Sequence, residues 1–166
     1  MSTLGHLTYL SHELDRRVVP GASGTVYLAG PITGETFESA NWWRTAATLP
    51  LEEHGWRVLS PLRGKAKFVP NTGTTVLSND FDGDREAFSR DTFDIDRSDV
   101  GIWNFDGAKR VSIGSVAEIG YAYARAKHIV VCTGDDEIHS EHLFIRNMAS
   151  IMVPTLDDAL HWIMDL

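Results

Sequence analysis

Short apolar runs alternate along the chain with longer segments in which apolar residues recur at helical spacing. The apolar runs cover 25–29, 56–59, 99–105, 128–132 and 151–153. Each has the length of a buried strand. Strands separated by helices pair in parallel, because each connection crosses back over the sheet. We therefore predict a single-domain, doubly wound α/β fold of the flavodoxin-like (Rossmann-like) type, with five parallel strands in the order 2-1-3-4-5.

Residues 1–24 stand apart from this pattern. A short helical repeat of leucine and valine ends there in the sequence Pro-Gly-Ala-Ser-Gly, which breaks regular structure. We expect an N-terminal extension over 1–24 and one α/β domain over 25–166. This first segment also carries charged residues, so it lacks the apolar core of a signal peptide.

Residues 61–84 show no periodicity and are rich in Gly, Asn, Thr and Asp. A stretch of this length inside a compact domain indicates a binding loop or lid. Three cations are candidates to contact a ligand there, with solvated surface as the alternative: Arg63, Lys65 and Lys67. The run 80–84 resembles part of a calcium loop, but its glycine is out of register, so we predict no metal.

Composition narrows the classes of partner. The 166 residues are 43% apolar and 23% charged, as in ordinary globular proteins. The net charge of −8 argues against binding a nucleic acid polymer, whereas a small anion can still bind to backbone N–H groups. No run of 18 apolar residues occurs, so we expect no membrane contact and a cytoplasmic location. The single cysteine, Cys132, lies in an apolar run and is predicted to pack in the core.

The stretch 112–124 is predicted to be a turn that leads into a helix between strands three and four. Glu118 is expected in the first turn, where unpaired N–H groups and the helix dipole keep a carboxylate ionised. Such a group is a plausible nucleophile or base. The alternative is a capping box between Ser115 and Glu118, in which nothing reacts. Small residues that predict close approach of this helix to the sheet recur at Gly114, Ala117, Gly120 and Ala124.

The ligand crevice of such a fold lies at the carboxyl ends of the strands. Two glycines and a proline form a tight loop there after the first strand. The candidate substrate-binding residues of this loop are Gly30, Pro31, Ile32 and Gly34. Because Glu118 falls at the same edge, its position favours a chemical role over capping.

A helix predicted over 85–97 carries three aspartates. Asp91, Asp94 and Asp96 cannot all face the same way at 100° per residue, so at least one is expected to be plain surface. The expected apolar anchors of this helix are Phe88, Phe93 and Ile95.

Four motifs resemble the nucleoside 2-deoxyribosyltransferase family, including its 2′-deoxynucleoside 5′-monophosphate N-hydrolase-like members. They are Tyr-Leu-Ala-Gly-Pro at 27–31, Arg-Asp at 90–91, Ser-Asp-Val at 98–100 and Gly-Ser-Val-Ala-Glu-Ile-Gly-Tyr-Ala at 114–122. The resemblance spans 25–165. It implies cleavage of the N-glycosidic bond of a (2′-deoxy)nucleoside or its 5′-monophosphate, with no metal or cofactor.

The resemblance also implies roles for single residues. Glu118 would attack the anomeric carbon, and a second base or water would resolve the glycosyl intermediate, by the logic of retaining glycosidases. Asp91, eight residues before Asp99, would assist the base or hold the sugar. Tyr27 would lie near the sugar and the nucleophile, with a buried strand aromatic as the alternative.

Ser112 departs from the nucleoside transferases, which have an aspartate six residues before the nucleophile. A carboxylate repels a phosphate, whereas a hydroxyl beside helix N–H groups accepts one. The N-hydrolase-like members are similar in having serine there. We therefore expect a 5′-phosphorylated substrate, with Gly114 and Ser115 as further binding residues. The alternative is that Ser112 only caps the turn.

Family members complete each site with residues of a neighbouring subunit, so the resemblance implies a homodimer or higher homo-oligomer. The segment 142–148 occupies the corresponding place, where Asn147 could reach the partner's ligand, with His142 and Arg146 as alternatives. The implied partners are a nucleoside or nucleotide and a free nucleobase. A non-catalytic nucleotide-binding sensor on the same fold is the alternative function. Two carboxylates, Glu118 and Asp91, favour the enzyme.

Overall fold

The computed structural model describes residues 23–63 and 83–166. The predicted extension over 1–24 therefore lies almost wholly outside the described residues. The same holds for Lys65 and Lys67, and for most of the run that resembles a calcium loop. Of the three candidate cations, only Arg63 can be placed.

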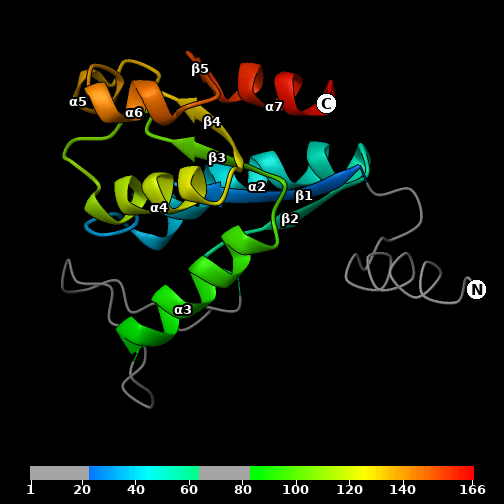
Figure 1. Cartoon of the computed structure of the whole chain (residues 1–166), viewed down its shortest axis with the longest axis horizontal. Helices are drawn as coiled ribbons and strands as arrows, with labels where there is room; N and C mark the ends of the chain where they lie inside the picture. Colours follow the sequence, from blue (N-terminus) through cyan, green and yellow to red (C-terminus); the bar gives the residue numbers. More distant parts are fainter. Residues whose placement is uncertain (1–22, 64–82) are drawn as a thin grey trace, which may run out of the picture.

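Five parallel strands form one sheet in the order β2-β1-β3-β4-β5, as predicted from the sequence (Figure 1). Every neighbouring pair is parallel, which requires a crossover between successive strands. Three of the predicted strand ranges agree with the structure, and the other two differ by one residue at one end or at both. The strands are β1 Gly24–Ala29, β2 Trp56–Leu59, β3 Val100–Asn104, β4 His128–Cys132 and β5 Ile151–Val153.

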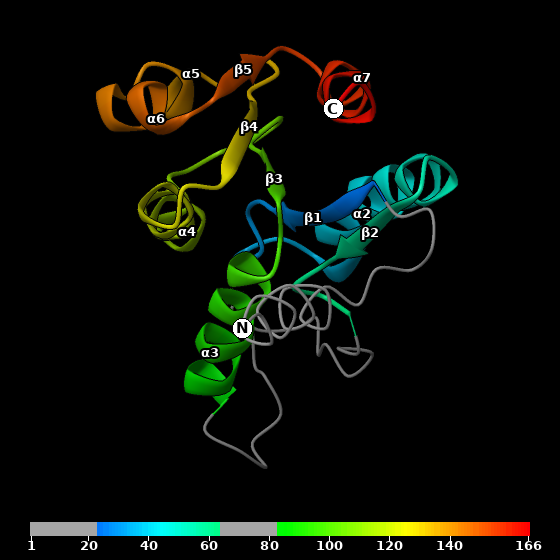
Figure 2. The same ribbon diagram turned by 45° about the vertical axis from the view of Figure 1, so that its right-hand side comes forward.

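Helices cover both faces of the sheet, as Figure 2 shows. One face is covered by α2 (Phe37–Glu53) and α7 (Leu156–Met164). The other is covered by α3 (Gly83–Asp96), α4 (Ile113–Ala124) and α6 (Leu143–Met148), and a short α5 (Glu137–Ser140) precedes α6. Among the described residues, no helix has both the length and the apolar character needed to cross a bilayer.

The side chains of β1 alternate between the two layers of the core. Val26 and Leu28 pack toward α2 and α7, whereas Tyr27 and Ala29 pack on the side of α3 and α4. All four are at most 1% exposed. This alternation places the Tyr27 side chain on the same side of the sheet as Glu118.

The anchors predicted for α3 are wrong in part. Phe88 and Phe93 are 70% and 60% exposed, and of the three expected anchors only Ile95 is buried. For Phe88 the reason is that the first half of α3 extends beyond the sheet (Figure 1). Phe93 lies in the last turn, on a side of the helix that does not pack against the sheet. The Phe93 ring lies instead under the guanidinium of Arg97, 4.9 Å from its centroid.

Glu118 does not lie in the first turn of α4 as expected, and the alternative of a capping box between Ser115 and Glu118 does not hold either. Ser112 is the N-cap, so Ser115 lies inside the helix and Glu118 falls in the second turn. The small residues do not face the sheet either. The buried positions are Ser115, Ile119 and Ala122, and a Cβ atom added at Gly114 would meet nothing within 4 Å. The face of α4 that packs against the sheet is therefore the one that carries Ser115, Ile119 and Ala122.

Candidate active site

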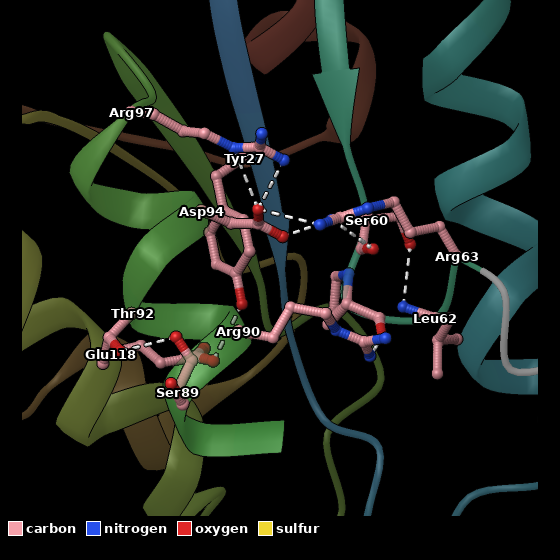
Figure 3. A network of polar contacts seen from close by, with 11 residues as sticks. Tyr27, Ser60, Leu62, Arg63, Ser89, Arg90, Thr92, Asp94, Arg97 and Glu118 are labelled. Atoms are coloured by element: carbon pink, nitrogen blue, oxygen red, sulfur yellow. Dashed lines mark hydrogen bonds and ion pairs between the residues drawn. The ribbon is translucent and has the colours of Figure 1, made fainter. Parts of the chain in front are cut away.

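Tyr27 and Glu118 meet at the carboxyl end of β1. The Tyr27 hydroxyl donates a hydrogen bond of 2.9 Å to Glu118 Oε1 (Figure 3). Tyr27 is completely buried, whereas Glu118 is half-buried. Burial raises the pKa of the Tyr27 hydroxyl well above 10, and the charges of Glu118 and Asp91 raise it further. Tyr27 therefore remains a neutral phenol and a hydrogen-bond donor to the carboxylate.

Asp91 and Arg44 belong to the same electrostatic group. Asp91 is half-buried on α3, and Arg44 is 1% exposed on α2. Burial lowers the pKa of Arg44 to about 10, although the charges of Tyr27, Glu118 and Asp91 raise it. Arg44 thus stays a cation at neutral pH, and it partly balances the two carboxylates. Sequence reasoning missed this residue, because an arginine in an amphipathic helix ordinarily reads as surface.

Arg44 on α2 holds the loop that follows β1, by a hydrogen bond to Gly30. Its Nη2 donates to the carbonyl oxygen of Gly30 at 3.0 Å, and its Nη1 donates to Ala40. Gly30 is buried, and a Cβ atom there would lie 2.6 Å from the carbonyl oxygen of Asn104. Only glycine therefore lets the loop pass so close to the end of β3.

Arg110 joins the loops that follow β1 and β3. Its guanidinium donates to the carbonyl oxygen of Thr33 and lies directly against Gly34, which has φ of +83°. Glycine adopts this backbone without strain, and any side chain there would collide with Arg110. The other two predicted residues of the loop, Pro31 and Ile32, are half-buried.

The start of α4 holds Ser112 by two hydrogen bonds. Its hydroxyl donates to Ser115 Oγ at 2.9 Å, and its backbone N–H donates to His139 Nε2 at 3.1 Å. The Ser112 side chain makes no capping bond to the helix backbone. His139 in turn contacts Asp136, whose carboxylate is 2.9 Å from Nδ1. His139 and Asp136 could not be identified from the sequence, because their segment has the composition of a polar loop.

The other two aspartates of α3 have partners, so the prediction that at least one is plain surface is wrong. Asp94 is completely buried between the guanidinium groups of Arg63 and Arg97 (Figure 3). Asp96 accepts from Tyr121 and Arg125 of the α4 region. Most partners of these two carboxylates come from other segments of the chain. The helical periodicity of α3 alone could not predict them. Arg63 is thereby engaged in a structural ion pair.

Asn147 lies apart from these contacts. It is exposed on α6, where its side-chain amide donates to the carbonyl oxygen of Leu143 at 2.8 Å. Two neighbouring apolar side chains on this helix, Leu143 and Phe144, are 69% and 66% exposed. Within the described ranges, no three His, Cys, Asp or Glu side chains come together in a way that could hold a metal ion.

Comparison with known proteins supplies the chemical context. The sequence profile of the family described as nucleoside 2-deoxyribosyltransferase matches residues 26–152, from β1 to β5. No match was found among curated proteins.

Several solved structures have the same fold. A 2-deoxyribosyltransferase from Bacillus psychrosaccharolyticus has a TM-score of 0.60 at 20% identity and covers 82% of this chain and 90% of its own. A 2-deoxyribosyltransferase from Leishmania mexicana has a TM-score of 0.63 at 15% identity, with coverages of 85% and 97%. A CMP N-glycosidase from Clostridium botulinum has a TM-score of 0.53 at 22% identity, with coverages of 84% and 96%. At these identities the likeness establishes a shared fold.

Proposed function

Because the chain belongs to the nucleoside 2-deoxyribosyltransferase family, we propose that it cleaves the N-glycosidic bond of a (2′-deoxy)nucleoside or its 5′-monophosphate through Glu118. The observation that carries this proposal is the hydrogen bond from the buried Tyr27 hydroxyl to Glu118. It fixes the orientation of the carboxylate that we propose as the nucleophile. A carboxylate placed in this way needs little reorganisation before attack.

In the first step, a Glu118 oxygen forms a bond to the anomeric carbon while the bond from that carbon to the base nitrogen breaks. The electron pair of the broken bond leaves with the base, which takes up a proton from Asp91 in its acid form or from water. In the second step, water or another base attacks the anomeric carbon. The bond to Glu118 then breaks, the carboxylate is restored, and the nucleophile loses its proton to Asp91 or to solvent.

Arg44 contributes to this chemistry through its charge and through its hydrogen bond to the loop after β1. The buried cation offsets the negative charge of Glu118, and that of Asp91 when Asp91 is ionised, so both carboxyl groups can lie near the completely buried Tyr27. Its hydrogen bond to Gly30 also fixes the loop that would border the sugar. Arg44 therefore has a positioning role.

A 5′-phosphorylated substrate fits the surroundings of α4. Ser112 is a hydroxyl at the position of the transferase aspartate, and Ser115 is its hydrogen-bond partner. Arg110 adds a guanidinium on the preceding loop, exposed and next to Gly34. A guanidinium offers five N–H donors, which suits a phosphate. The fold shared with a CMP N-glycosidase agrees with a nucleotide substrate.

We expect Ser112→Asp to shift the substrate preference away from 5′-monophosphates, because the introduced carboxylate would repel the negatively charged phosphate. The ratio of kcat/KM for a 5′-monophosphate to that for its nucleoside should fall at least tenfold, a change of about 1.4 kcal/mol. Steady-state rates with the two substrates measure it. If the unmodified protein already prefers unphosphorylated nucleosides, the phosphate assignment is wrong.

The site is proposed to be completed by a second copy of the chain. Asn147 sits on α6 beside the exposed side chains of Leu143 and Phe144, which suit an interface between subunits. In that arrangement Asn147 would contact the ligand of the neighbouring subunit.

The activity is tested with a panel of nucleosides and 5′-monophosphates, with and without a free acceptor base, and chromatography of the products. Base release without an acceptor indicates hydrolysis, and a new nucleoside with an acceptor indicates transfer. Glu118→Gln keeps an oxygen that accepts from Tyr27 but removes the nucleophile, so we expect turnover to fall by about 10³-fold or more. Ligand binding should be retained.

The control is Glu53→Gln, an exposed position at the end of α2, which should behave as the unmodified protein. The alternative of a nucleotide sensor predicts a different pattern, in which ligands bind to the unmodified protein but no substrate of the panel loses its base. That outcome would overturn the enzymatic proposal.

A further inference from the structure

We propose that His139 is a positioning residue for the substrate end of α4, and that Asp136 holds its imidazole in the tautomer this role requires. The inference rests on the proposed function, because it concerns how Ser112 is presented to the substrate. The two residues lie on and beside α5, far in sequence from the loop that they fix.

The hydrogen bonds at the two ring nitrogens determine where the proton lies. The backbone N–H of Ser112 can only donate, so His139 Nε2 must accept and carries no proton. The Asp136 carboxylate accepts, so the ring proton lies on Nδ1 and points to Oδ2 at 2.9 Å. The imidazole is therefore neutral and in a single tautomer.

Both side chains are held rigidly. His139 is 1% exposed and stacks on Phe105, with ring centroids 3.9 Å apart and planes within 7°. Asp136 also accepts from the backbone N–H groups of Ile138 and His139, at 3.0 and 2.9 Å. The carboxylate thus caps α5 and orients the ring at the same time.

The contact matters because Ser112 begins α4. Its carbonyl oxygen accepts the first helical hydrogen bond, from Val116, and its hydroxyl donates to Ser115. The hydrogen bond to His139 holds the Ser112 backbone, and the bond to Ser115 holds the hydroxyl that is proposed to contact the phosphate. The contact joins the loop after β3 to the segment after β4. Without the acceptor, a shielded N–H would lose its partner and the turn would rearrange.

The direct test is the ¹⁵N NMR spectrum of the histidine side chains in the unmodified protein, with His139 assigned by comparison with His139→Gln. We expect a protonated Nδ1 and an unprotonated Nε2 at neutral pH. This readout does not depend on activity, so it separates a failure of this inference from a failure of the proposed function. A protonated Nε2 would overturn the inference.

Two substitutions at the same position separate the acceptor from the packing. His139→Phe keeps a ring on Phe105 but has no acceptor, whereas His139→Gln has an acceptor oxygen but no ring. We expect the Phe variant to speed hydrogen exchange of the Ser112 amide and raise KM for a 5′-monophosphate, each about tenfold, with a smaller change in kcat. The Gln variant should restore most of both losses.

The matched control is His161→Phe, at an exposed position on α7, which should leave exchange and KM unchanged. Equal losses in the Phe and Gln variants would show that a hydrogen-bond acceptor at this position does not account for the effect. Unchanged Ser112 exchange in the Phe variant would show that the contact positions nothing. Either result would overturn the proposal. If one variant fails to fold, the other still assigns His139, and the tautomer measurement on the unmodified protein decides the proposal.

Discussion

At the scale of single residues, burial decides what a polar group can do. The Tyr27 hydroxyl is completely buried and its pKa is raised, so it donates a proton to a hydrogen bond and does not ionise. Glu118, its partner, is half-buried and so remains reachable. The pair thus combines a fixed donor with an accessible acceptor.

Tyr27→Phe removes one oxygen and leaves the aromatic ring in the core. A hydrogen bond to a charged group contributes about 1.5–3 kcal/mol, so we expect kcat/KM to fall roughly 10- to 100-fold. The melting temperature should change little, because Glu118 can be hydrated instead. Steady-state kinetics and a thermal melt measure the two quantities. An unchanged kcat/KM would show that the hydrogen bond does not prepare the nucleophile.

The Cys132 thiol is the second example. Burial raises its pKa to about 11, and the charges of Asp106 and Asp158 add to the effect. At pH 8 only about one thiol in a thousand is ionised, and only the thiolate is reactive. We expect an aromatic disulfide reagent to react with the unfolded chain at once and with the native protein very slowly. Fast reaction of the native protein would contradict both the burial and the pKa.

At the scale of elements, polar contacts fix where the helices lie. Asp96, at the end of α3, accepts from Tyr121 Oη at 3.1 Å and from Arg125 Nε at 2.7 Å. Burial alone would raise the pKa of the Asp96 carboxyl, but these hydrogen bonds outweigh it and lower the pKa. This junction connects the helix that carries Asp91 with the helix that carries Glu118.

A lowered pKa makes the stability of this junction depend on pH. The contribution of Asp96 is present above the unfolded carboxyl pKa of about 3.9 and is lost as the pH falls through the lower, folded value. Asp96→Asn should therefore reduce the free energy of unfolding above pH 5, by less than about 1 kcal/mol because Asp96 and Arg125 are partly exposed. Urea unfolding from pH 2 to 7 measures it. A difference from the unmodified protein that persists at pH 2 would contradict this assignment.

At the scale of the whole molecule, exposed apolar side chains on α6 mark where the proposed interface between subunits would lie. Phe144 and Leu143 are exposed on α6, next to Asn147. We expect Phe144→Glu to convert an oligomer to a single chain and to lower activity, because the charge would disrupt the interface. Light scattering after gel filtration measures the mass.

The control for this prediction is Leu49→Glu. Leu49 is similarly exposed, at 62%, but lies on α2 over the opposite face of the sheet. It should leave both mass and activity unchanged. A single chain with full activity in the unmodified protein would mean that one copy forms the complete site.

The sequence was sufficient for the sheet and only partly sufficient for the site. Each strand is a short apolar run, and β1, β3 and β4 are mostly buried on both faces. Such runs are visible without any tertiary contact. Glu118, Asp91 and Tyr27 were predicted as a group through motif resemblance, and the structure brings them together. Arg44 and His139 could not be predicted, because each acts through a contact with a distant segment that leaves no periodic signal.

The close approach at Gly30 bears on how the protein could be re-engineered for other nucleosides. A methyl group there would lie 2.6 Å from the carbonyl oxygen of Asn104, whereas Gly114 and Gly120 face open space in the chain. A mutant library that randomises position 30 would consist mainly of misfolded members. Substitutions at position 114 should instead leave the fold intact, so a library there could change the substrate specificity.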